Sequence, residues 1–340
     1  MKRKRVAILG ASGYTAGELA AILLRHSGTE IVAATSRKDE SLTLADHHPR
    51  LRSRIVLPCE PFNPEELAKK QLDFAFSCLP HGASAEAVSQ VLRLGIRVVD
   101  LSADYRIRSP QEQRKWYGQD HHDPENMKHA VYGLPEMNES EIASARLVAN
   151  PGCYPQTVIL SMAPLVKNGW IDIESIVADC KSGISGAGRT PKLATHFPEC
   201  NESVTAYQVG IHRHTPEMEQ ALDNFERGKT KVLFIPHLIP MDRGIFATVV
   251  ATPHKDLHES DLIELFEAFY SQHPFVRIVR SIPATKNTLH TNFIDIHPTI
   301  ARGKVVVLAC LDNLIRGASG VAVQNFNIMN GWCQKTGLDF

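Results

Sequence analysis

Short apolar runs alternate with segments of helical periodicity over the first hundred residues. The run Val6–Leu9 ends in a glycine-rich turn, after which Leu19, Ile22 and Leu23 recur at helical spacing. Further strands are expected at 30–35, 73–77 and 97–100, with a helix over 83–94 that ends at Gly95. Strands that alternate with helices in this way are typical of a parallel, doubly wound sheet of the α/β class.

The pattern changes in the second half of the chain. Residues 105–147 are polar and interrupted by prolines, which favours loops and short helices. After Pro151, longer strands joined by short turns predict a mixed or antiparallel sheet, at 174–181, 231–238, 244–252, 292–297 and 304–311. Helices are expected at 155–167, 216–226, 259–270 and 317–329. The first three should cover one face of the sheet, with a kink at Pro164, which makes a second domain of the α+β type.

Composition narrows the classes of function. The 340 residues suffice for roughly two domains, at about 150 residues each. Lys and Arg together number 37, as do Asp and Glu, so the chain has no charge excess for binding nucleic acid or an anionic membrane, and a small-molecule partner is expected. The longest apolar run, 305–311, is far shorter than the ~20 residues that span a bilayer.

Cysteine usage and the first residues indicate a cytoplasmic protein. The basic start is followed by an apolar stretch that stops at Gly10 without a cleavage site for a signal peptide. The seven cysteines form no CxxC pair, and a chain of this length does not depend on disulfides. We therefore expect reduced thiols.

The turn GASGYTAG, from Gly10 to Gly17, lies between the first strand and the first helix. Glycines at such a turn let backbone N–H groups approach a pyrophosphate, whose charge the helix dipole favours. The spacing differs from the usual GxGxxG, and a glycine turn can also be only a tight connection. Its place at the start of an α/β chain favours a Rossmann-type dinucleotide-binding domain.

The end of the second strand indicates which dinucleotide is bound. An NAD site usually has an acidic residue there, whereas this chain has Thr35, Ser36, Arg37 and Lys38. A hydroxyl and two cations suit the 2′-phosphate of NADP. The alternative is a solvated loop, since acidic residues follow directly.

Cys153 is the candidate nucleophile. It lies in a Pro-Gly turn just before a helix whose first position can be Pro155. The positive end of that helix lowers the pKa of a thiol and favours the reactive thiolate. Most cysteines are small core residues, which accounts for the other six. An exposed turn is a poor place for a packing residue.

A partner base is expected near such a thiol, and the segment HRHTPE offers His212 and His214. Thr215 can be the N-cap of the next helix, with Pro216 as its first residue. In an extended segment the two imidazoles would point to one side. A metal site or surface histidines are the alternatives, but no third ligand is evident and no metal is expected. The pairs His47-His48 and His121-His122 resemble polar loops.

Two arginine-bearing loops complete the candidate site. The loop SGISGAGR combines free N–H groups with a guanidinium, which suits a phosphate or carboxylate, and its candidates are Ser185, Gly186 and Arg189. The loop LSADYR presents Arg106. Each loop alone could be an ordinary polar turn. Together with a thiol and a nicotinamide site, they describe a pocket for an anionic acyl compound.

These motifs together resemble one enzyme family. In order, GASGYT, LSADYR, YGLPE, ANPGCYP, SGISGAGR, GIHRHTPE and GASGVAVQNFNIM are similar to N-acetyl-γ-glutamyl-phosphate reductases of arginine biosynthesis. Aspartate-semialdehyde dehydrogenases share the architecture and the cysteine chemistry, but HRHTPE and NPGCYP are similar to the glutamyl-phosphate branch. Two segments depart from the family: GYTGAE is Tyr14-Thr15-Ala16-Gly17-Glu18 here, and CYPT ends in Gln156.

The resemblance implies roles for individual residues. Cys153 would be the nucleophile and His214 the acid/base, with His212 a weaker candidate that otherwise binds substrate. NADP would be held by residues of both halves of the first domain: Gly10, Ser12, Gly13, Tyr14, Thr15, Ser36, Arg37, Cys78, Leu79, Pro80 and Asn325. Because Asn325 belongs to this set, we expect an NADP-binding domain of residues 1–151 with 315–340. A catalytic and dimerisation domain would comprise 152–314, in a homodimer or homotetramer.

The expected reaction follows from the thiol. Cys153 would attack the acyl phosphate, releasing phosphate and leaving a thioester that accepts hydride from NADPH, with His214 handling the proton. A reductase for the longer aminoadipyl phosphate of lysine biosynthesis would use the same residues. An NADP-sensing regulator would keep the glycine turn without needing Cys153 and His214 together.

Overall fold

The computed structural model describes residues 3–37, 42–225 and 227–338. The chain divides into two compact units, Met1–Pro151 with Ala318–Phe340 and Gly152–Gly317. These units are defined by packing alone. The domains expected from the sequence, an NADP-binding domain of 1–151 with 315–340 and a catalytic and dimerisation domain of 152–314, stay a prediction.

The first unit contains a seven-stranded sheet in the order β3-β2-β1-β4-β5-β7-β6, in which every strand pair is parallel. The predicted strands and helices of its first half are present as β1 (Lys4–Leu9), α1 (Tyr14–Leu23), β2 (Thr29–Thr35), β4 (Phe74–Ser77), α4 (Ser84–Arg93) and β5 (Arg97–Asp100). The doubly wound fold is therefore confirmed. β1 and β4 are neighbours while the chain between them runs outward through β2, so the strand order reverses at their carboxyl ends, where such sheets bind ligands.

Short elements complete this sheet. The polar segment holds the predicted short helices, α5 (Pro110–Tyr117), α6 (Pro124–Met127) and α7 (Pro135–Ser144), each of which begins with a proline. The sequence analysis did not predict β3 (Cys59–Glu60), β6 (Val131–Tyr132) and β7 (Leu147–Ala149), nor α2 (Leu44–His47) and α3 (Pro64–Lys69). Elements of two to six residues show too few turns or alternations to give a periodic signal.

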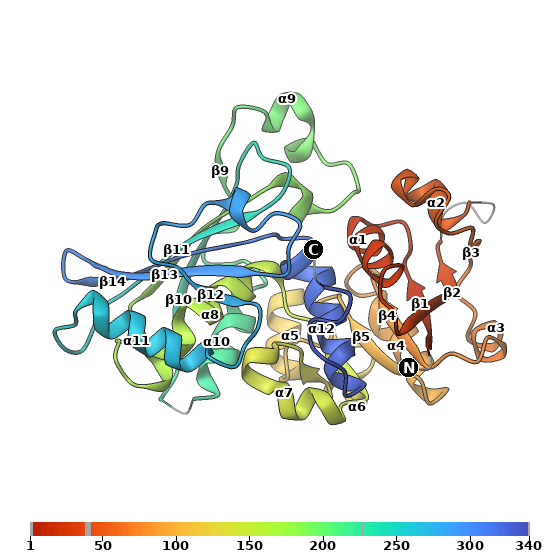
Figure 1. The fold of residues 1–340 in the computed structure, drawn as a ribbon, viewed down its shortest axis with the longest axis horizontal. Coiled ribbons are helices and arrows are strands. Elements are labelled where there is room, and N and C mark those ends of the chain that lie inside the picture. Colours follow the sequence, from red (N-terminus) through yellow and green to blue (C-terminus); the bar gives the residue numbers. More distant parts are fainter. Residues whose placement is uncertain (1–2, 38–41, 226, 339–340) are drawn as a thin grey trace. The chain divides into compact units, whose positions relative to one another are not determined.

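Helices cover both faces of the sheet in the first unit. On one face, Ala85, Val88 and Val91 of α4 share a buried cluster with Leu9 and Val98 of the strands. On the other lies α12 (Gly320–Met329), the last helix of the chain, which contacts α1 and α7 (Figure 1). The Phe326 ring packs edge-on against Phe74 with centroids 4.7 Å apart and contacts Phe76 at 5.5 Å. This burial ties the end of the chain to the centre of the sheet.

The second unit contains a mixed seven-stranded sheet in the order β12-β13-β14-β11-β8-β10-β9. The five predicted strands are β8 (Ile176–Ser182), β10 (Val232–Leu238), β11 (Ile245–Ala251), β13 (Ile294–Ala301) and β14 (Lys304–Leu311), and the edge strands β9 (Thr205–Ala206) and β12 (Val276–Ile278) were not predicted. The pairs β8–β10 and β12–β13 are parallel and the others antiparallel.

Three helices cover one face of this mixed sheet (Figure 1): α8 (Cys153–Lys167), α10 (Thr215–Asp223) and α11 (Glu259–Tyr270). The central helix α8 continues through Pro164. Proline has no N–H to donate to the carbonyl four residues earlier, that of Leu160. The buried Tyr270 hydroxyl donates to that carbonyl instead, at 2.6 Å, which satisfies the group that Pro164 leaves without its helical donor.

The opposite face of the mixed sheet has half-buried side chains in alternate positions, for example on β8 and β11. The register aligns them in rows across four strands. One row is entirely apolar: Leu233, Val177, Val250 and Val306. The next row places Ile235, Asp179, Thr248 and Leu308 side by side. An antiparallel or mixed sheet with one face on the core normally has a polar second face. Here that face carries one entirely apolar row beside a row that includes the polar Asp179 and Thr248, so it is only partly apolar.

Candidate active site

Cys153 is the first residue of α8, and Gly152 is the N-cap. The helix therefore begins two residues earlier than the sequence analysis expected. Pro155 is its third residue, which proline tolerates because the first N–H groups of a helix have no intrahelical acceptor. The Thr157 hydroxyl donates to the Cys153 carbonyl at 3.0 Å. Gln156 is fully buried, and neither atom of its amide has a hydrogen-bond partner among the described residues.

Four of the other thiols differ from Cys153 in their surroundings. The expectation that all six are core residues is wrong for Cys200, which is half-buried, and for Cys333, which is exposed. Burial raises the pKa of Cys59 to about 11 and the pKa values of Cys78 and Cys310 to about 12. Burial also raises the pKa of Cys180. These thiols stay protonated at neutral pH and pack as small apolar groups.

Backbone packs directly against Cys153. A Cβ atom added at Gly317 would lie 2.8 Å from the Cβ of Cys153, so only glycine permits this approach. Gly317 belongs to the π-helical turn Ile315–Ser319, and its N–H donates to the Asp312 carbonyl at 2.8 Å. The sequence analysis did not single out Gly317, since nothing in its neighbourhood indicates that it meets a segment more than 160 residues away.

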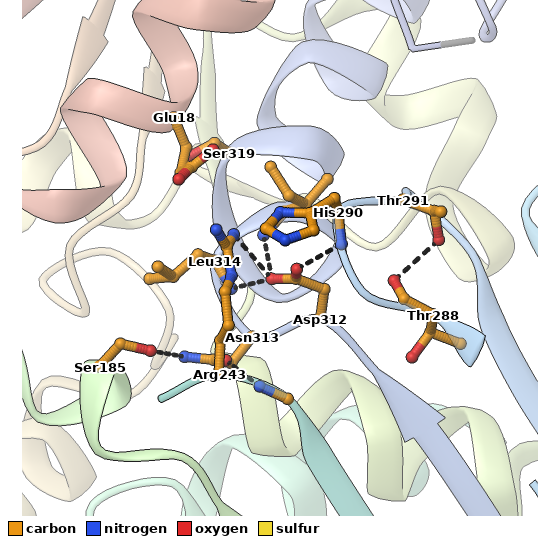
Figure 2. Close-up of polar contacts among 12 residues, drawn as sticks. Glu18, Ser185, Arg243, Thr288, His290, Thr291, Asp312, Asn313, Leu314 and Ser319 are labelled. Atoms are coloured by element: carbon orange, nitrogen blue, oxygen red, sulfur yellow. Dashed lines mark hydrogen bonds and ion pairs between the residues drawn. The ribbon is translucent and has the colours of Figure 1, made fainter. Parts of the chain in front are cut away.

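The turn that carries Gly317 is held by a buried carboxylate, that of Asp312 (Figure 2). Its Oδ1 accepts hydrogen bonds from the N–H groups of Leu314 and Ile315, at 2.9 and 3.0 Å. The Arg243 guanidinium lies 3.1 Å from the same oxygen, and the His290 N–H donates to Oδ2 at 2.7 Å. A charge-assisted network of this kind fixes the turn, and through it the position of Gly317.

The histidine segment is a turn rather than an extended strand. The Thr215 N–H donates to the His212 carbonyl at 2.9 Å, which closes the turn, and α10 begins at Thr215 with His214 as its N-cap. The prediction of Thr215 as N-cap was therefore wrong by one residue. Its hydroxyl is buried and has no partner in the described part of the chain. The rings of His212 and His214 still lie close, with centroids 4.7 Å apart.

His212 is held neutral. Burial lowers its pKa to about 4, and the charge of Arg213 acts in the same direction. The backbone N–H of His214 donates to Nδ1 of the His212 ring at 3.1 Å. Nδ1 is therefore the acceptor, and the ring proton of His212 lies on Nε2. The ring is enclosed by Tyr154, Tyr207 and Phe234, with centroids 6.2, 5.5 and 5.2 Å away.

A carboxylate of α10 reaches the N-terminus of α8. Glu217 is fully buried, and its Oε1 accepts the Gly152 N–H at 2.7 Å. The helix of His214 thus contacts the residue that precedes Cys153. The sequence analysis treated Glu217 only as the end of the motif HRHTPE, because a bond between two helices leaves no local pattern.

The arginine-bearing loops differ in exposure. Ser185 is buried and accepts a hydrogen bond from Asn313 at 3.0 Å, while Gly186 and Arg189 are exposed. Arg106 belongs to the first unit and is buried. Its guanidinium donates to the carbonyls of Asn150 and Leu101, at 2.7 and 3.0 Å, which gives it a structural task.

The glycine turn of the first unit is built for close approach of a ligand. Gly10 has a φ of +82°, and a Cβ there would lie 2.9 Å from the Cys78 carbonyl oxygen, so the turn packs directly on the Cys78 loop. Helix α1 follows with Gly13 as N-cap, and no side chain of the described residues caps it. Its first N–H groups therefore have no side-chain acceptor, as in phosphate-binding turns.

His48 supports this turn, contrary to the expectation of a polar loop. Both His47 and His48 are buried, and His48 Nε2 lies 2.7 Å from the Ala11 carbonyl oxygen. A Cβ at Gly17 would lie 2.5 Å from the His48 ring. The glycine at this position therefore accommodates the imidazole, while Ala16 is fully buried in the helix.

A pocket of about 360 Å³ opens beside the end of β2. It combines apolar side chains with the predicted phosphate-binding pair, and its lining includes Thr35, Ser36, Arg37, Phe62, Leu79 and Ala87. Lys38, which the sequence analysis grouped with Arg37, lies outside the described residues. Tyr14 is exposed, and Thr15 forms a side-chain hydrogen bond with Cys78.

The side-chain oxygen of Asn325, in α12, is a hydrogen-bond acceptor that has no donor among the described residues. Its side-chain nitrogen donates to the Gly133 carbonyl at 2.8 Å and to Asn150 Oδ1 at 3.2 Å. Its own Oδ1 is buried, and no hydrogen-bond partner for it occurs among the described residues. A carboxamide that donates N–H groups would satisfy this oxygen.

The residues that the structure describes offer neither a metal site nor a membrane-spanning helix. No group of three His, Cys, Asp or Glu side chains is arranged to hold a metal ion. No helix has the length and apolar content needed to cross a membrane.

Comparison with known proteins decides the family. The chain is 45% identical to an N-acetyl-gamma-glutamyl-phosphate reductase of Rhodopirellula baltica over 339 residues, which covers 98% of each chain. It is also 45% identical to a protein of the same name from Geotalea daltonii, again with 98% of each chain covered. This chain belongs to the N-acetyl-gamma-glutamyl-phosphate reductase family.

Family models and solved structures agree with this membership. Residues 5–145 match the model of a semialdehyde dehydrogenase NAD binding domain, and residues 153–313 match that of a semialdehyde dehydrogenase dimerisation domain. The first unit is thus a nicotinamide-dinucleotide-binding domain. Aspartate semialdehyde dehydrogenase II of Vibrio cholerae shares the fold, with a TM-score of 0.74, 15% identity and coverage of 97% of this chain and 99% of that one. An aspartate semialdehyde dehydrogenase from Candida albicans, solved with NADP, gives a TM-score of 0.71 at 15% identity, with the same coverage of both chains.

In this member of the reductase family, Gly317→Ala should displace Cys153 without unfolding the protein. The added methyl group would contact the Cys153 Cβ, so α8 must shift away from its present neighbours. We expect the alkylation rate of Cys153 by iodoacetamide at pH 7 to fall about tenfold, equivalent to roughly 1.4 kcal/mol less stabilisation of the thiolate. The rate is measured by mass spectrometry of the peptide that contains Cys153.

Gly303→Ala is the matched control. Gly303 has a φ of +73° and open space around it, so the substitution strains the backbone at a distance from Cys153. Its alkylation rate should equal that of the unmodified protein. Equal rates in the Gly317 and Gly303 variants would show that the contact does not position the thiol.

Proposed function

We propose that this chain reduces N-acetyl-L-glutamyl 5-phosphate to N-acetyl-L-glutamate 5-semialdehyde and phosphate with NADPH, a step of arginine biosynthesis. The observation that carries the proposal is the pairing of two helix N-termini, with Cys153 at the start of α8 and His214 at the start of α10. The relatives that share the chain over its full length carry the name of this activity. In the proposal Cys153 is the nucleophile and His214 the general acid and base.

The position of Cys153 supports attack on an acyl phosphate. The first N–H groups of α8 and its dipole favour a negative charge on the sulfur, and the side chain is partly exposed. The thiolate attacks the acyl carbon, the carbon–oxygen bond to phosphate breaks, and a thioester remains on Cys153. A thioester accepts hydride far more readily than a carboxylate does, which explains the need for a cysteine.

The two histidines have different capacities for proton transfer. In His212 the Nδ1 lone pair accepts the His214 N–H, and Nε2 carries the proton, so its neutral ring has no free base position. His212 can donate its Nε2–H to a substrate oxygen. We therefore assign proton transfer to His214, which takes the thiol proton and later protonates the thiohemiacetal oxygen or returns a proton as the thiol leaves.

The first unit suits NADPH at three points. The glycine turn with Ser12 and Thr15, followed by α1, offers N–H groups to the pyrophosphate. The pocket beside β2 suits the adenosine, with Ser36 and Arg37 toward the 2′-phosphate. The buried Oδ1 of Asn325 suits the carboxamide of the nicotinamide, and we assign the loop of Cys78, Leu79 and Pro80, which packs against Gly10, to the same cofactor. NADPH bound in this way supplies the hydride.

Substrate binding involves exposed and buried groups. Arg189 supplies a cation for the phosphate or the α-carboxylate, next to Gly186 and the hydroxyl of Ser185. Arg106 was predicted to bind substrate as well. Its guanidinium donates to two backbone carbonyls, so in the proposal Arg106 contributes less to substrate binding than Arg189 does.

The first test is the reaction itself. The purified protein, given N-acetylglutamate 5-semialdehyde, phosphate and NADP, should form NADPH, because the reaction is reversible. The Cys153→Ser variant should be inactive while it still binds NADPH, since a hydroxyl is a far weaker nucleophile at neutral pH. Substantial turnover by the serine variant would refute the thioester route, and an inactive unmodified protein would refute the substrate.

The second test separates the two histidines. His214→Asn should lower kcat by about 10²–10⁴-fold, the usual contribution of general acid–base catalysis. His212→Asn should cost less, because its neutral ring donates only a hydrogen bond. Both variants are measured from pH 5.5 to 9. If His212→Asn is the strongly impaired variant and His214→Asn is close to normal, the assignment is reversed.

The third test concerns the cofactor. Arg37→Ala should reduce the preference for NADPH over NADH by about 10- to 100-fold in kcat/KM, since charge-assisted hydrogen bonds contribute roughly 1.5–3 kcal/mol. Steady-state kinetics with both cofactors give the ratio. An unchanged ratio would place the 2′-phosphate elsewhere.

We also propose a cytoplasmic homodimer or homotetramer. None of the seven cysteines forms a disulfide bond, as in a reducing compartment. The apolar row on the open face of the mixed sheet lies within the residues that match a dimerisation domain. Burial of Leu233, Val177, Val250 and Val306 against the same face of a second copy would remove these side chains from water.

Sedimentation velocity tests this interface. Val250→Asp places a charge at the middle of the apolar row, and we expect the variant to sediment as a smaller species than the unmodified protein. If both sediment alike as oligomers, another surface forms the contact.

A further inference from the structure

Two helix N-termini meet at one buried carboxylate. Glu217 is the third residue of α10, three positions after His214, and its side chain is fully buried. Its Oε1 accepts the N–H of Gly152, the N-cap of α8, at 2.7 Å. The carboxylate therefore joins the start of the helix of Cys153 to the start of the helix of His214, and α8 and α10 pack together.

The hydrogen bond from Gly152 to Glu217 is unusual because it joins two helices. In a capping box, an acidic side chain at the third helical position accepts the N–H of the N-cap of its own helix. The N-cap of α10 is His214, and its N–H donates to His212 Nδ1 instead. Glu217 stands at the capping-box position of one helix and accepts the N-cap N–H of the other.

The N-terminus of α8 needs hydrogen-bonding support from another segment of the chain, because its N-cap is Gly152. A glycine N-cap has no side chain to accept the first N–H groups of α8, and no side-chain cap is formed there. The Glu217 carboxylate lies at the N-termini of both helices, where the helix dipoles interact favourably with an acidic side chain. Gly317, which packs against Cys153 itself, also limits movement of this helix end.

We infer that Glu217 is a positioning residue, which sets the register between the thiol of Cys153 and the ring of His214 by holding the two helix ends together. The inference rests on the proposed function, because it concerns these two residues as the reacting pair. Glu217 acts by accepting the backbone N–H of Gly152. A different side chain that accepts the same hydrogen bond should therefore position the two helix ends equally well.

Glu219 provides a matched control on the same helix. Its Oε1 accepts the Val232 N–H at 3.0 Å, so it also joins α10 to the backbone of another element, the start of β10. This bond involves neither Gly152 nor the backbone of the histidine turn. Glu217→Ala and Glu219→Ala each remove a carboxylate that accepts a backbone N–H, but only the first removes the link to α8.

The experiment compares Glu217→Ala, Glu217→Gln and Glu219→Ala in the full chain. Glu217→Ala should lower kcat by about 10²-fold, the effect of a displacement of roughly 1 Å between reacting groups, with the Kd of NADPH unchanged. Glu217→Gln keeps an oxygen that can accept the Gly152 N–H and should restore kcat to within a few-fold of the unmodified protein. Glu219→Ala should leave kcat unchanged, and thermal unfolding of each variant shows whether it is folded at the assay temperature.

Alkylation of Cys153 by iodoacetamide is measured in parallel and needs no substrate. Its rate should fall severalfold in Glu217→Ala and stay unchanged in Glu217→Gln and Glu219→Ala. Normal kcat and alkylation in Glu217→Ala would overturn the inference. So would equal losses in Glu217→Ala and Glu217→Gln, or equal losses in Glu217→Ala and Glu219→Ala. If the unmodified protein does not turn over the acyl phosphate, the proposed function fails, whereas the alkylation rates still decide whether Glu217 positions the thiol.

Discussion

The proposed reaction depends on the position of one helix end, the N-terminus of α8. Cys153 is the first residue of α8, where the N–H groups have no intrahelical acceptor and the helix dipole favours a negative charge. A helix end in this state must be held by neighbours that leave the sulfur accessible. Here the neighbours are the backbone of Gly317, which packs against Cys153, and the carboxylate of Glu217, which binds Gly152. The buried Asp312 in turn holds the turn of Gly317.

Their different surroundings give His212 and His214 different proposed roles. His212 is enclosed by aromatic rings and accepts a backbone N–H, so it stays neutral across the physiological range. Its pKa of about 4 lies below that of an unfolded histidine, so the unfolded chain binds the extra proton between pH 4 and 6.5. His212 therefore reduces the stability of the fold as the pH falls through this window. In the proposed mechanism, His214, at the N-cap of α10, is the residue that exchanges protons.

Much of the fold could be predicted from the sequence, because strands of four or more residues and helices of ten or more give a periodic signal. The strands β1, β5 and β14 and the helices α4 and α11 illustrate this. Two-residue strands such as β3 and β9 have no such signal. Helix starts were misplaced by one or two residues, at Thr215 and Cys153, since the turn at His212 and the early start of α8 depend on hydrogen bonds that the motifs do not encode. Gly317, Glu217 and His48 were missed for a related reason: each acts on a segment distant in sequence, and only the folded chain brings the partners together.

The most direct test of this account is to trap the acyl group on the enzyme. The protein is incubated with N-acetylglutamyl 5-phosphate in the absence of NADPH, released phosphate is measured, and tryptic peptides are analysed by mass spectrometry. The account predicts one phosphate per active site and an N-acetylglutamyl adduct on the peptide that contains Cys153, which disappears when NADPH is added. Release of phosphate with no adduct on Cys153, or an adduct on another residue that NADPH then discharges, would contradict it.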